Sequence, residues 1–175
     1  MVGARHAAYG CDMLTQKARY GLRALAVLAA AAEASGRRSM LTIQEIAERA
    51  NTPRKFLEAI LLDLRRHGFV GSVRGKAGGY ALARPAGEIA LSAVIRAIDG
   101  PLAPIPCASL TAYRPCTDCA VPESCAIRQV MRRVRDATAT ILDGTSVADL
   151  ARGGTGAALL DGALATPAPG VKESA

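Results

Sequence analysis

The segment from Leu41 to Tyr80 constrains the fold of this chain more than any other stretch. Thr42 and Glu45 have the spacing of a capping box, in which a hydroxyl and a carboxylate accept hydrogen bonds from the free N–H groups at the start of a helix. The apolar residues that follow recur at helical spacing: Ile43, Ile46, Ala47 and Ala50. The pattern predicts a short helix directly after Thr42.

A second helix is predicted from about Pro53 to Arg66. Pro53 lacks the N–H that would continue the first helix, but it suits the first position of a new one, with Thr52 as the expected cap. The apolar positions share one side: Phe56, Leu57, Ile60, Leu61 and Leu64. Charged residues point the other way: Arg54, Lys55, Glu58 and Arg65. A helix that enters the major groove of DNA needs such a polar outer face.

After the second helix the pattern changes to that of a β-hairpin. A strand-like run from Phe69 to Arg74 and a second from Tyr80 to Leu82 flank the sequence Gly-Lys-Ala-Gly-Gly. This is a predicted wing, with cations near its tip at Arg74 and Lys76. The spacing alone would also suit a compact helical fold with solvated charges and no nucleic-acid partner.

Three runs in this chain resemble the Rrf family of winged helix-turn-helix transcriptional regulators, in particular its IscR- and NsrR-like iron–sulfur members. The most specific run is the wing, Ser72 to Tyr80. The others are Phe56-Leu57-Glu58 and, upstream, Leu14-Thr15 with Lys17 to Tyr20. The resemblance covers about Met13 to Leu150 and implies a bacterial DNA-binding regulator that is not an enzyme.

The expected fold is mainly α-helical with a small β-hairpin wing: a winged helix-turn-helix domain followed by a long C-terminal dimerisation helix. The expected partner is double-stranded DNA with a palindromic operator. The candidate DNA-binding residues lie on the second helix and the wing: Thr52, Arg54, Lys55, Glu58, Arg74, Lys76, Gly78, Gly79 and Tyr80.

The net charge of +7 is concentrated in the first half of the chain. Residues 1–84 hold 14 Lys or Arg against 6 Asp or Glu, whereas residues 85–175 hold 8 against 9. A basic half that carries a helix-turn-helix favours binding to phosphates. Aromatic residues make up only 3% of the chain, so there is little for stacking against single-stranded bases.

No stretch has the length and apolar character of a membrane span, and the N-terminus does not resemble a secretory signal. We therefore expect a cytoplasmic protein without a membrane partner. Residues 1–12, which include His6 and Cys11, are expected to be a disordered or mis-annotated leader before a natural start at Met13. The winged domain is expected over 13–100 and a disordered tail over 153–175.

A long amphipathic helix is predicted from Ser124 onward, within an expected dimerisation region at 126–152. Its apolar stripe comprises Ile127, Val130, Met131, Val134, Ala137, Ile141 and Leu142, with arginines largely off the stripe. Such a stripe at the end of a small domain needs a partner. The same helix of a second copy is the simplest one, and the family resemblance implies such a homodimer.

Four cysteines fall within the expected cysteine-rich loop, residues 101–125: Cys107, Cys116, Cys119 and Cys125. Thiolates are preferred ligands of both zinc and iron–sulfur clusters, so the spacing alone leaves the two comparable. The resemblance implies an iron–sulfur cluster of unassigned type on Cys107, Cys119 and Cys125, although the interval between the first two is longer here.

Two departures from the family pattern bear on the cluster type. Arg128 stands where some cluster-binding members have a histidine ligand, and Arg19 stands where others have an aspartate ligand. Neither arginine can serve as a ligand, so the fourth ligand is either Cys116, the natural candidate, or a small molecule or solvent.

The predicted function is a DNA-binding regulator, a repressor, that senses iron–sulfur, redox or nitrosative status through this cluster. Three alternatives stay open: a thiol-redox regulator without a cluster, a zinc-stabilised regulator, and a metal-binding interaction or electron-carrier protein.

Overall fold

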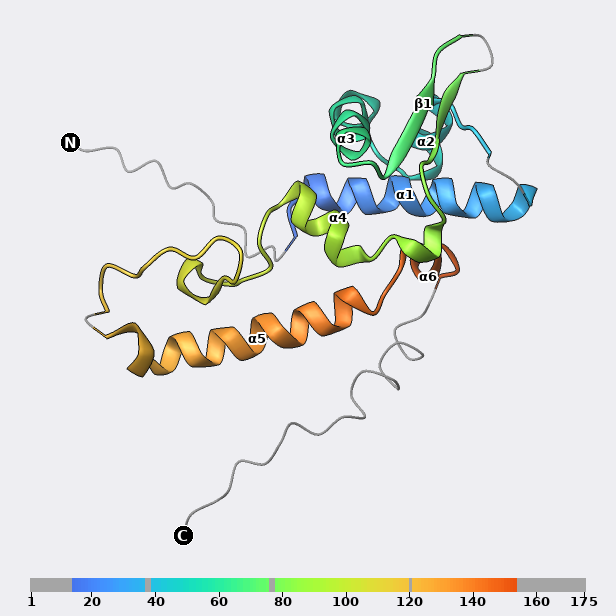
Figure 1. Cartoon of the computed structure of the whole chain (residues 1–175). Helices are drawn as coiled ribbons and strands as arrows, with labels where there is room; N and C mark the ends of the chain where they lie inside the picture. Colours follow the sequence, from blue (N-terminus) through green and yellow to red (C-terminus); the bar gives the residue numbers. More distant parts are fainter. Residues whose placement is uncertain (1–13, 37–38, 76–77, 120, 154–175) are drawn as a thin grey trace, which may run out of the picture.

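The computed structural model describes residues 14–36, 39–75, 78–119 and 121–153 (Figure 1). The predictions for the leader, including His6 and Cys11, and for the tail beyond residue 153 lie outside these ranges, as does Lys76 at the wing tip.

Helix α1 (Gln16–Ser35) runs through the middle of the winged domain, and the other elements of that domain pack around it (Figure 1). The Thr15 side chain caps its start by accepting a hydrogen bond from the Ala18 N–H (3.2 Å), and Gly36 ends it in the left-handed conformation (φ 61°). Small and branched side chains fill its buried face, so α3, α4 and α6 can approach closely: Ala18, Leu22, Ala24, Leu25, Leu28 and Ala29.

The helix-turn-helix consists of α2 (Ile43–Arg49) and α3 (Arg54–Arg66). The predicted capping box is confirmed, since Thr42 and Glu45 hydrogen-bond in both directions. The predicted Thr52 cap is wrong. Pro53 occupies the N-cap position, and the Thr52 hydroxyl is buried and donates to the Ala50 carbonyl (3.1 Å).

The apolar side of α3 differs from the prediction at one position. Leu57, Ile60, Leu61 and Leu64 are buried, but Phe56 is 48% exposed at the edge of the buried face.

The predicted wing is confirmed as an antiparallel hairpin of β1 (Val70–Val73) and β2 (Gly79–Leu82), in register Val70↔Leu82 to Val73↔Gly79. A bridge between Leu41 and Tyr80 ties the hairpin to the start of the helix-turn-helix. Gly79 is required there, because a Cβ at this position would lie 2.5 Å from the Leu41 carbonyl oxygen.

A short 3₁₀ turn, η1 (Ala86–Glu88), leads from the wing into α4 (Leu91–Ile98). Ser92 follows the first residue of α4 and does not cap the helix, although serine is a common capping residue. Ala90 is the N-cap, and Ser92 lies inside the helix, buried, with its hydroxyl donating to the Asp143 carboxylate. The two residues come from segments 51 positions apart, so only packing could bring them together.

The C-terminal part forms two helices, α5 (Ala126–Asp143) and α6 (Val147–Ala151). Backbone bonds hold the junction between them to the winged domain: Leu91 N–H to Thr145 O and Val147 N–H to Ile89 O, both 2.9 Å. Helix α6 packs against α1, whereas α5 extends away from the winged domain (Figure 1). No helix in the described part of the chain is long and apolar enough to cross a membrane.

The expected fold class is confirmed: the protein is mainly helical with a two-stranded hairpin and C-terminal helices. Its core is almost entirely aliphatic. Among the described residues that are buried in the core, Phe69 is the one aromatic residue.

Candidate functional site

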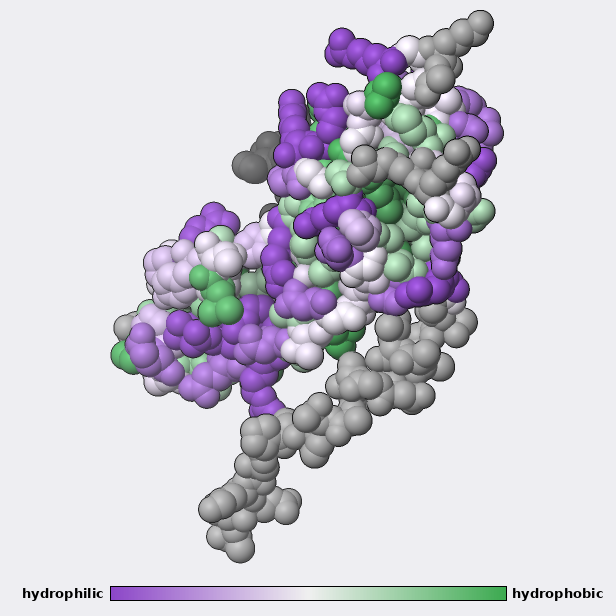
Figure 2. Space-filling model, turned by 45° about the vertical axis from the view of Figure 1, so that its right-hand side comes forward, coloured by the Kyte–Doolittle hydropathy of each residue, from purple (hydrophilic) through white to green (hydrophobic). Residues whose placement is uncertain are grey.

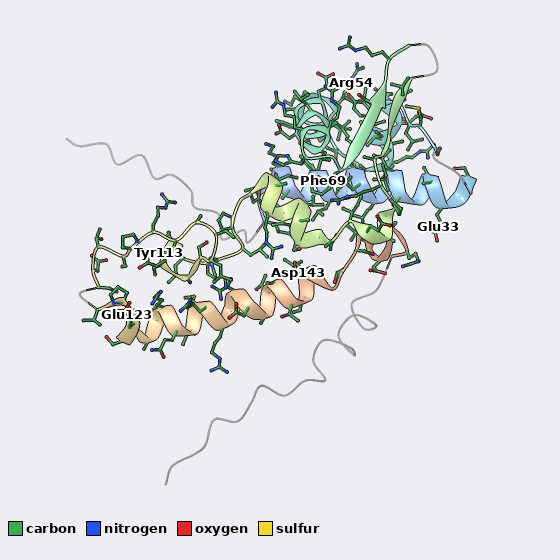
Figure 3. The ribbon with its side chains drawn as sticks, viewed as in Figure 1. Glu33, Arg54, Phe69, Tyr113, Glu123 and Asp143 are labelled. Atoms are coloured by element: carbon green, nitrogen blue, oxygen red, sulfur yellow. The ribbon has the colours of Figure 1, made fainter. Side chains whose placement is uncertain are left out.

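The outward face of α3 is exposed, as predicted, and carries paired charges. Arg54 and Glu58 approach to 3.5 Å, one helical turn apart. Arg65 donates to the Ser72 hydroxyl on β1 (3.1 Å), which joins α3 to the wing. Figure 2 shows hydrophilic side chains at the upper end of the molecule, where Figure 1 places α3 and the wing. Figure 3 labels Arg54 in this region.

The predicted wing residues have different surroundings. Arg74 is exposed near the tip, so its side chain is free to reach a ligand. Gly78 and Gly79 pass close to backbone atoms of neighbouring segments, which leaves no room for a side chain at either position. Tyr80 is partly buried, and its N–H and C=O both bond to Leu41 (2.8 and 2.9 Å). These three residues therefore shape the wing, and Thr52, with a buried hydroxyl, is not placed to reach DNA.

The start of α1 belongs to the same surface, which the sequence reasoning did not identify. A hollow of about 340 Å³ lies between α1 and α3. It is lined by Gln16, Lys17, Tyr20, Lys55, Phe56, Ala59 and Ile60. The Tyr20 and Phe56 rings stack at 6.3 Å, and the Lys55 ammonium lies 4.9 Å from the Phe56 ring centre. The sequence feature that could have indicated this contact between α1 and α3 was Phe56, an aromatic residue at the edge of the apolar stripe.

The cysteine-rich loop lies along the first half of α5, away from the wing and α3 (Figure 1). It contains two 3₁₀ turns, η2 (Pro106–Ala108) and η3 (Pro122–Ser124). Arg128 on α5 holds both: its guanidinium donates to the carbonyls of Cys107 (3.0 Å) and Pro122 (3.2 Å). It also lies 5.5 Å from the Tyr113 ring centre, and Figure 3 labels Tyr113 in this loop.

A second arginine of α5 also holds the loop. Arg135 donates to the carbonyl of Ala108 (2.5 Å) and pairs with Asp136. It lies off the apolar stripe, as predicted, but the loop buries it to 8% exposure. Both arginines therefore fix the loop through backbone carbonyls, without help from any sulfur atom.

Two of the four predicted ligands, Cys119 and Cys125, come into contact at the start of α5. The Sγ atoms of Cys119 and Cys125 are 3.7 Å apart, and Cys116 also interacts with Cys119. Cys107 is buried in η2 and is tied to this group through its carbonyl and Arg128. Among the described residues, no group of three or more His, Cys, Asp or Glu side chains converges closely enough to hold a metal ion.

The surroundings separate the two neighbouring thiols electrostatically. The hydrogen bond to Cys125, followed by one to Cys116, raises the pKa of Cys119 to about 11. The Arg128 backbone N–H at the start of α5, followed by the hydrogen bond from Cys119, lowers the pKa of Cys125. Cys125 is thus the thiol of the pair that ionises first.

The separation of these two sulfurs suits a shared metal. In a tetrahedral thiolate site with metal–sulfur bonds of about 2.3 Å, neighbouring sulfurs lie about 3.8 Å apart. The Cys119–Cys125 distance matches that edge. Soft, partly exposed donors at this spacing fit either an iron–sulfur cluster or zinc.

Comparison with known families identifies the chain. The model of the Rrf2 family, described as an iron-dependent transcriptional regulator, matches residues 14–153. The chain belongs to the Rrf2 family. The resemblance found in the sequence is confirmed, and the protein is a transcriptional regulator and not an enzyme.

Curated relatives and solved Rrf2-like structures agree with this assignment. The chain is 45% identical over 148 residues to an Rrf2-like HTH-type transcriptional regulator of Rhodobacter capsulatus, covering 85% of this chain and 98% of that protein. The structure of CymR, the global cysteine regulator of B. subtilis, superposes with a TM-score of 0.64 at 30% identity, covering 79% and 95% of the two chains. IscR of T. potens gives a TM-score of 0.61 at 26% identity, covering 82% and 89%.

His67, within the Rrf2-like region, has a structural position. Its Nδ1 lies 2.9 Å from the Asp63 carbonyl, and the residue itself is the C-cap of α3.

Proposed function

We propose that this Rrf2 family regulator is a cytoplasmic homodimeric repressor that binds a palindromic operator and senses iron–sulfur, redox or nitrosative status through a cysteine-held iron–sulfur cluster. The observation that carries the proposal is the contact between the Cys119 and Cys125 sulfurs at the start of α5. The same helix presents an apolar face to solvent and joins the winged domain at its other end.

In this proposal Cys119 and Cys125 supply two ligands, Cys107 the third and Cys116 the fourth. Because three or more ligating groups do not yet converge, η2 and the Cys116 segment would close around the group. A bound cluster would supply reversible one-electron chemistry and reactivity toward oxidants and nitric oxide. The residues Arg128 and Arg135 would hold the loop on α5 whether or not the cluster is present.

DNA binding is assigned to the face formed by α3, the wing tip and the start of α1. Lys55 and Glu58 project from the exposed side of α3, where side chains can reach base edges. Arg74, which is exposed near the wing tip, would contact phosphates or enter the minor groove, and the same role is proposed for Lys76 from the sequence. Lys17 and Gln16 extend this surface at the N-terminus of α1.

Dimerisation is assigned to α5. Its stripe is solvent-exposed in one copy: Ile127 (69%), Val130 (52%), Val134 (42%) and Ile141 (41%). Burying such side chains stabilises by about 1.5–3 kcal/mol each when burial is complete, so pairing with a second α5 is strongly favoured.

The junction between α5 and α4 would couple the two functions. Asp143 at the end of α5 accepts from Ser92 and pairs with Arg96 (3.0 Å), as Figure 3 places it beside α4. A change in the cysteine loop that tilts α5 would therefore move the two recognition helices relative to each other. Their spacing must match successive major grooves, about 34 Å apart.

Zinc is the second candidate for the cysteine site, because a Cys119–Cys125 distance of 3.7 Å suits zinc equally well. The electron-carrier alternative loses its basis, since the family consists of transcriptional regulators.

The cluster is tested by purifying the full chain without oxygen and measuring visible absorption, iron, sulfide and zinc. A brown protein with iron and sulfide, bleached by Cys119→Ser and by Cys125→Ser, supports the proposal. A colourless protein with one zinc per chain contradicts it.

The DNA contacts are tested by titrating variants against a footprinted operator and a mismatched duplex. Arg74→Ala should weaken binding to both duplexes alike and reduce the salt dependence. Glu58→Ala should instead change the preference between duplexes by about 1–3 kcal/mol. Identical behaviour of the two variants on both duplexes would contradict this docking.

A further inference from the structure

Cys119 and Cys125 are positioned to react with each other. Their sulfurs are 3.7 Å apart, and both side chains are partly exposed. The η3 turn between them reverses the chain, with backbone bonds from Ser124 N–H to Val121 O (3.3 Å) and from Cys125 N–H to Pro122 O (3.4 Å). A disulfide bond is about 2.05 Å long, so the two sulfurs need to approach by less than 2 Å.

We propose that Cys119 and Cys125 form a site of reversible oxidation by hydroperoxides, closing to an intramolecular disulfide whenever the loop holds no metal. The inference rests on the proposed function only in using two of the same thiols, and it gives them a chemistry of their own.

The reaction balances with a hydroperoxide as the co-reactant. One sulfur attacks the peroxide O–O bond and becomes a sulfenic acid, and its proton leaves with the departing oxygen as water or an alcohol. The other sulfur attacks the sulfenic sulfur, the S–S bond forms, and the hydroxyl leaves as water with the second thiol proton. The two sulfurs lose two electrons in total, and the peroxide gains them.

The other two cysteines of the loop are less suited to form a disulfide with Cys119 or Cys125. Cys107 is buried, and its backbone carbonyl accepts a hydrogen bond from the Arg128 guanidinium on α5 (3.0 Å). Cys116 interacts with Cys119, but the two sulfurs that a small loop movement would bring to bonding distance are those of Cys119 and Cys125, 3.7 Å apart.

The disulfide would act on metal loading. It consumes two thiolates of the proposed ligand set, so an oxidised chain cannot take up a cluster or zinc until a thiol reductant reopens it. The Arg128 bonds to Cys107 and Pro122 involve backbone carbonyls only, so the loop stays on α5 in both redox states.

The test uses the full chain, stripped of metal with a chelator, reduced, and then treated with hydrogen peroxide. Remaining thiols are blocked with N-ethylmaleimide before digestion with trypsin and an endoproteinase that cleaves before Asp. The four cysteines of the loop share one tryptic fragment, because Arg114 precedes Pro115 and trypsin does not cleave there. Cleavage before Asp118 then separates Cys107 and Cys116 from Cys119 and Cys125.

The expected result is a fragment from Asp118 to Arg128 that is about 2 Da lighter, unlabelled and restored by dithiothreitol. Cys107 and Cys116 should carry the label. Fragments linked across the Asp118 cleavage, a disulfide between two chains, or full labelling of Cys119 and Cys125 would each overturn the proposal.

Variants in which one cysteine is replaced by serine provide the matched controls. Cys116→Ser should keep the light fragment, whereas Cys119→Ser and Cys125→Ser should stop at a sulfenic acid that dimedone traps. Loss of the disulfide in Cys116→Ser would overturn the assignment. The wild-type fragment map decides the matter even if a variant fails to fold.

The same preparations separate this inference from the cluster proposal. A colourless protein that still forms the light fragment rejects the cluster and keeps the thiol pair. A coloured protein whose metal-free form does not form the fragment does the reverse.

Discussion

At the scale of single residues, close backbone approaches and hydrogen bonds to backbone or side-chain partners explain several positions in this chain. Gly79 lies against the Leu41 carbonyl, and this contact fixes the angle between the wing and α2. Arg128 fixes the cysteine loop by donating to two backbone carbonyls. Thr52 and Ser92 turn inward, where their hydroxyls have protein partners.

Gly79→Ala should destabilise the protein by about 1–3 kcal/mol, because the added methyl group overlaps the Leu41 backbone. Gly71→Ala in the paired strand is the matched control, since a Cβ there meets no atom within 4 Å. Urea unfolding of both variants measures the difference. Equal stabilities would show that the wing tolerates a side chain at residue 79.

At the scale of elements, the short α6 matters more than its length suggests. It packs on α1, and a capping box between Ser146 and Asp149 holds its first turn. Val147 within it is fully buried. Hydrogen bonds from Ser146, followed by the Arg152 guanidinium, lower the pKa of Asp149 to about 2. The carboxylate therefore stabilises the junction that returns the chain from α5 to the winged domain.

Asp149→Asn should lower the free energy of unfolding at pH 7 by about 1 kcal/mol, because the capping box loses the charged acceptor that Ser146 and Arg152 bind. The folded pKa is depressed, so this stabilisation is fully present above the unfolded value, about 3.9, and is lost as pH falls through the folded value. Urea unfolding from pH 7 to pH 3 should show the difference shrinking only below about pH 4. A difference that grows on acidification would contradict this assignment.

At the scale of the whole molecule, α5 runs from the cysteine loop at one end to the winged domain at the other (Figure 1). Its inner side holds the loop through Arg128 and Arg135, and its far end contacts α4 through Asp143. The apolar stripe remains exposed between them. This arrangement is suited to a dimer in which loop state and DNA geometry change together.

Val134→Glu should convert the proposed dimer into a folded monomer, because the charge would be buried at the interface while Val134 is 42% exposed within one chain. Operator affinity should fall at least tenfold, and circular dichroism should not change. Thr140→Glu, an exposed position off the stripe, is the control and should remain dimeric. Sedimentation velocity measures the oligomeric state of both variants. A Val134→Glu variant that remains dimeric would show that the interface lies elsewhere.

The sequence by itself determined the features that depend on local interactions. The capping box at Thr42, the helix break at Pro53, the wing and the long C-terminal helix all follow from hydrogen bonds and periodicities within a few residues. The motifs of the wing also sufficed to indicate the family.

Only the tertiary structure decided where side chains find partners far along the chain. Ser92 meets Asp143 across 51 positions, and Arg135 meets the Ala108 carbonyl across 27. The spacing of the four loop cysteines predicted a single set of ligands. The fold instead places Cys119 and Cys125 in contact and buries Cys107 in a separate turn. The physical reason is that local patterns fix which face of a helix is apolar, but the packing of distant segments determines what each polar group on that helix can reach.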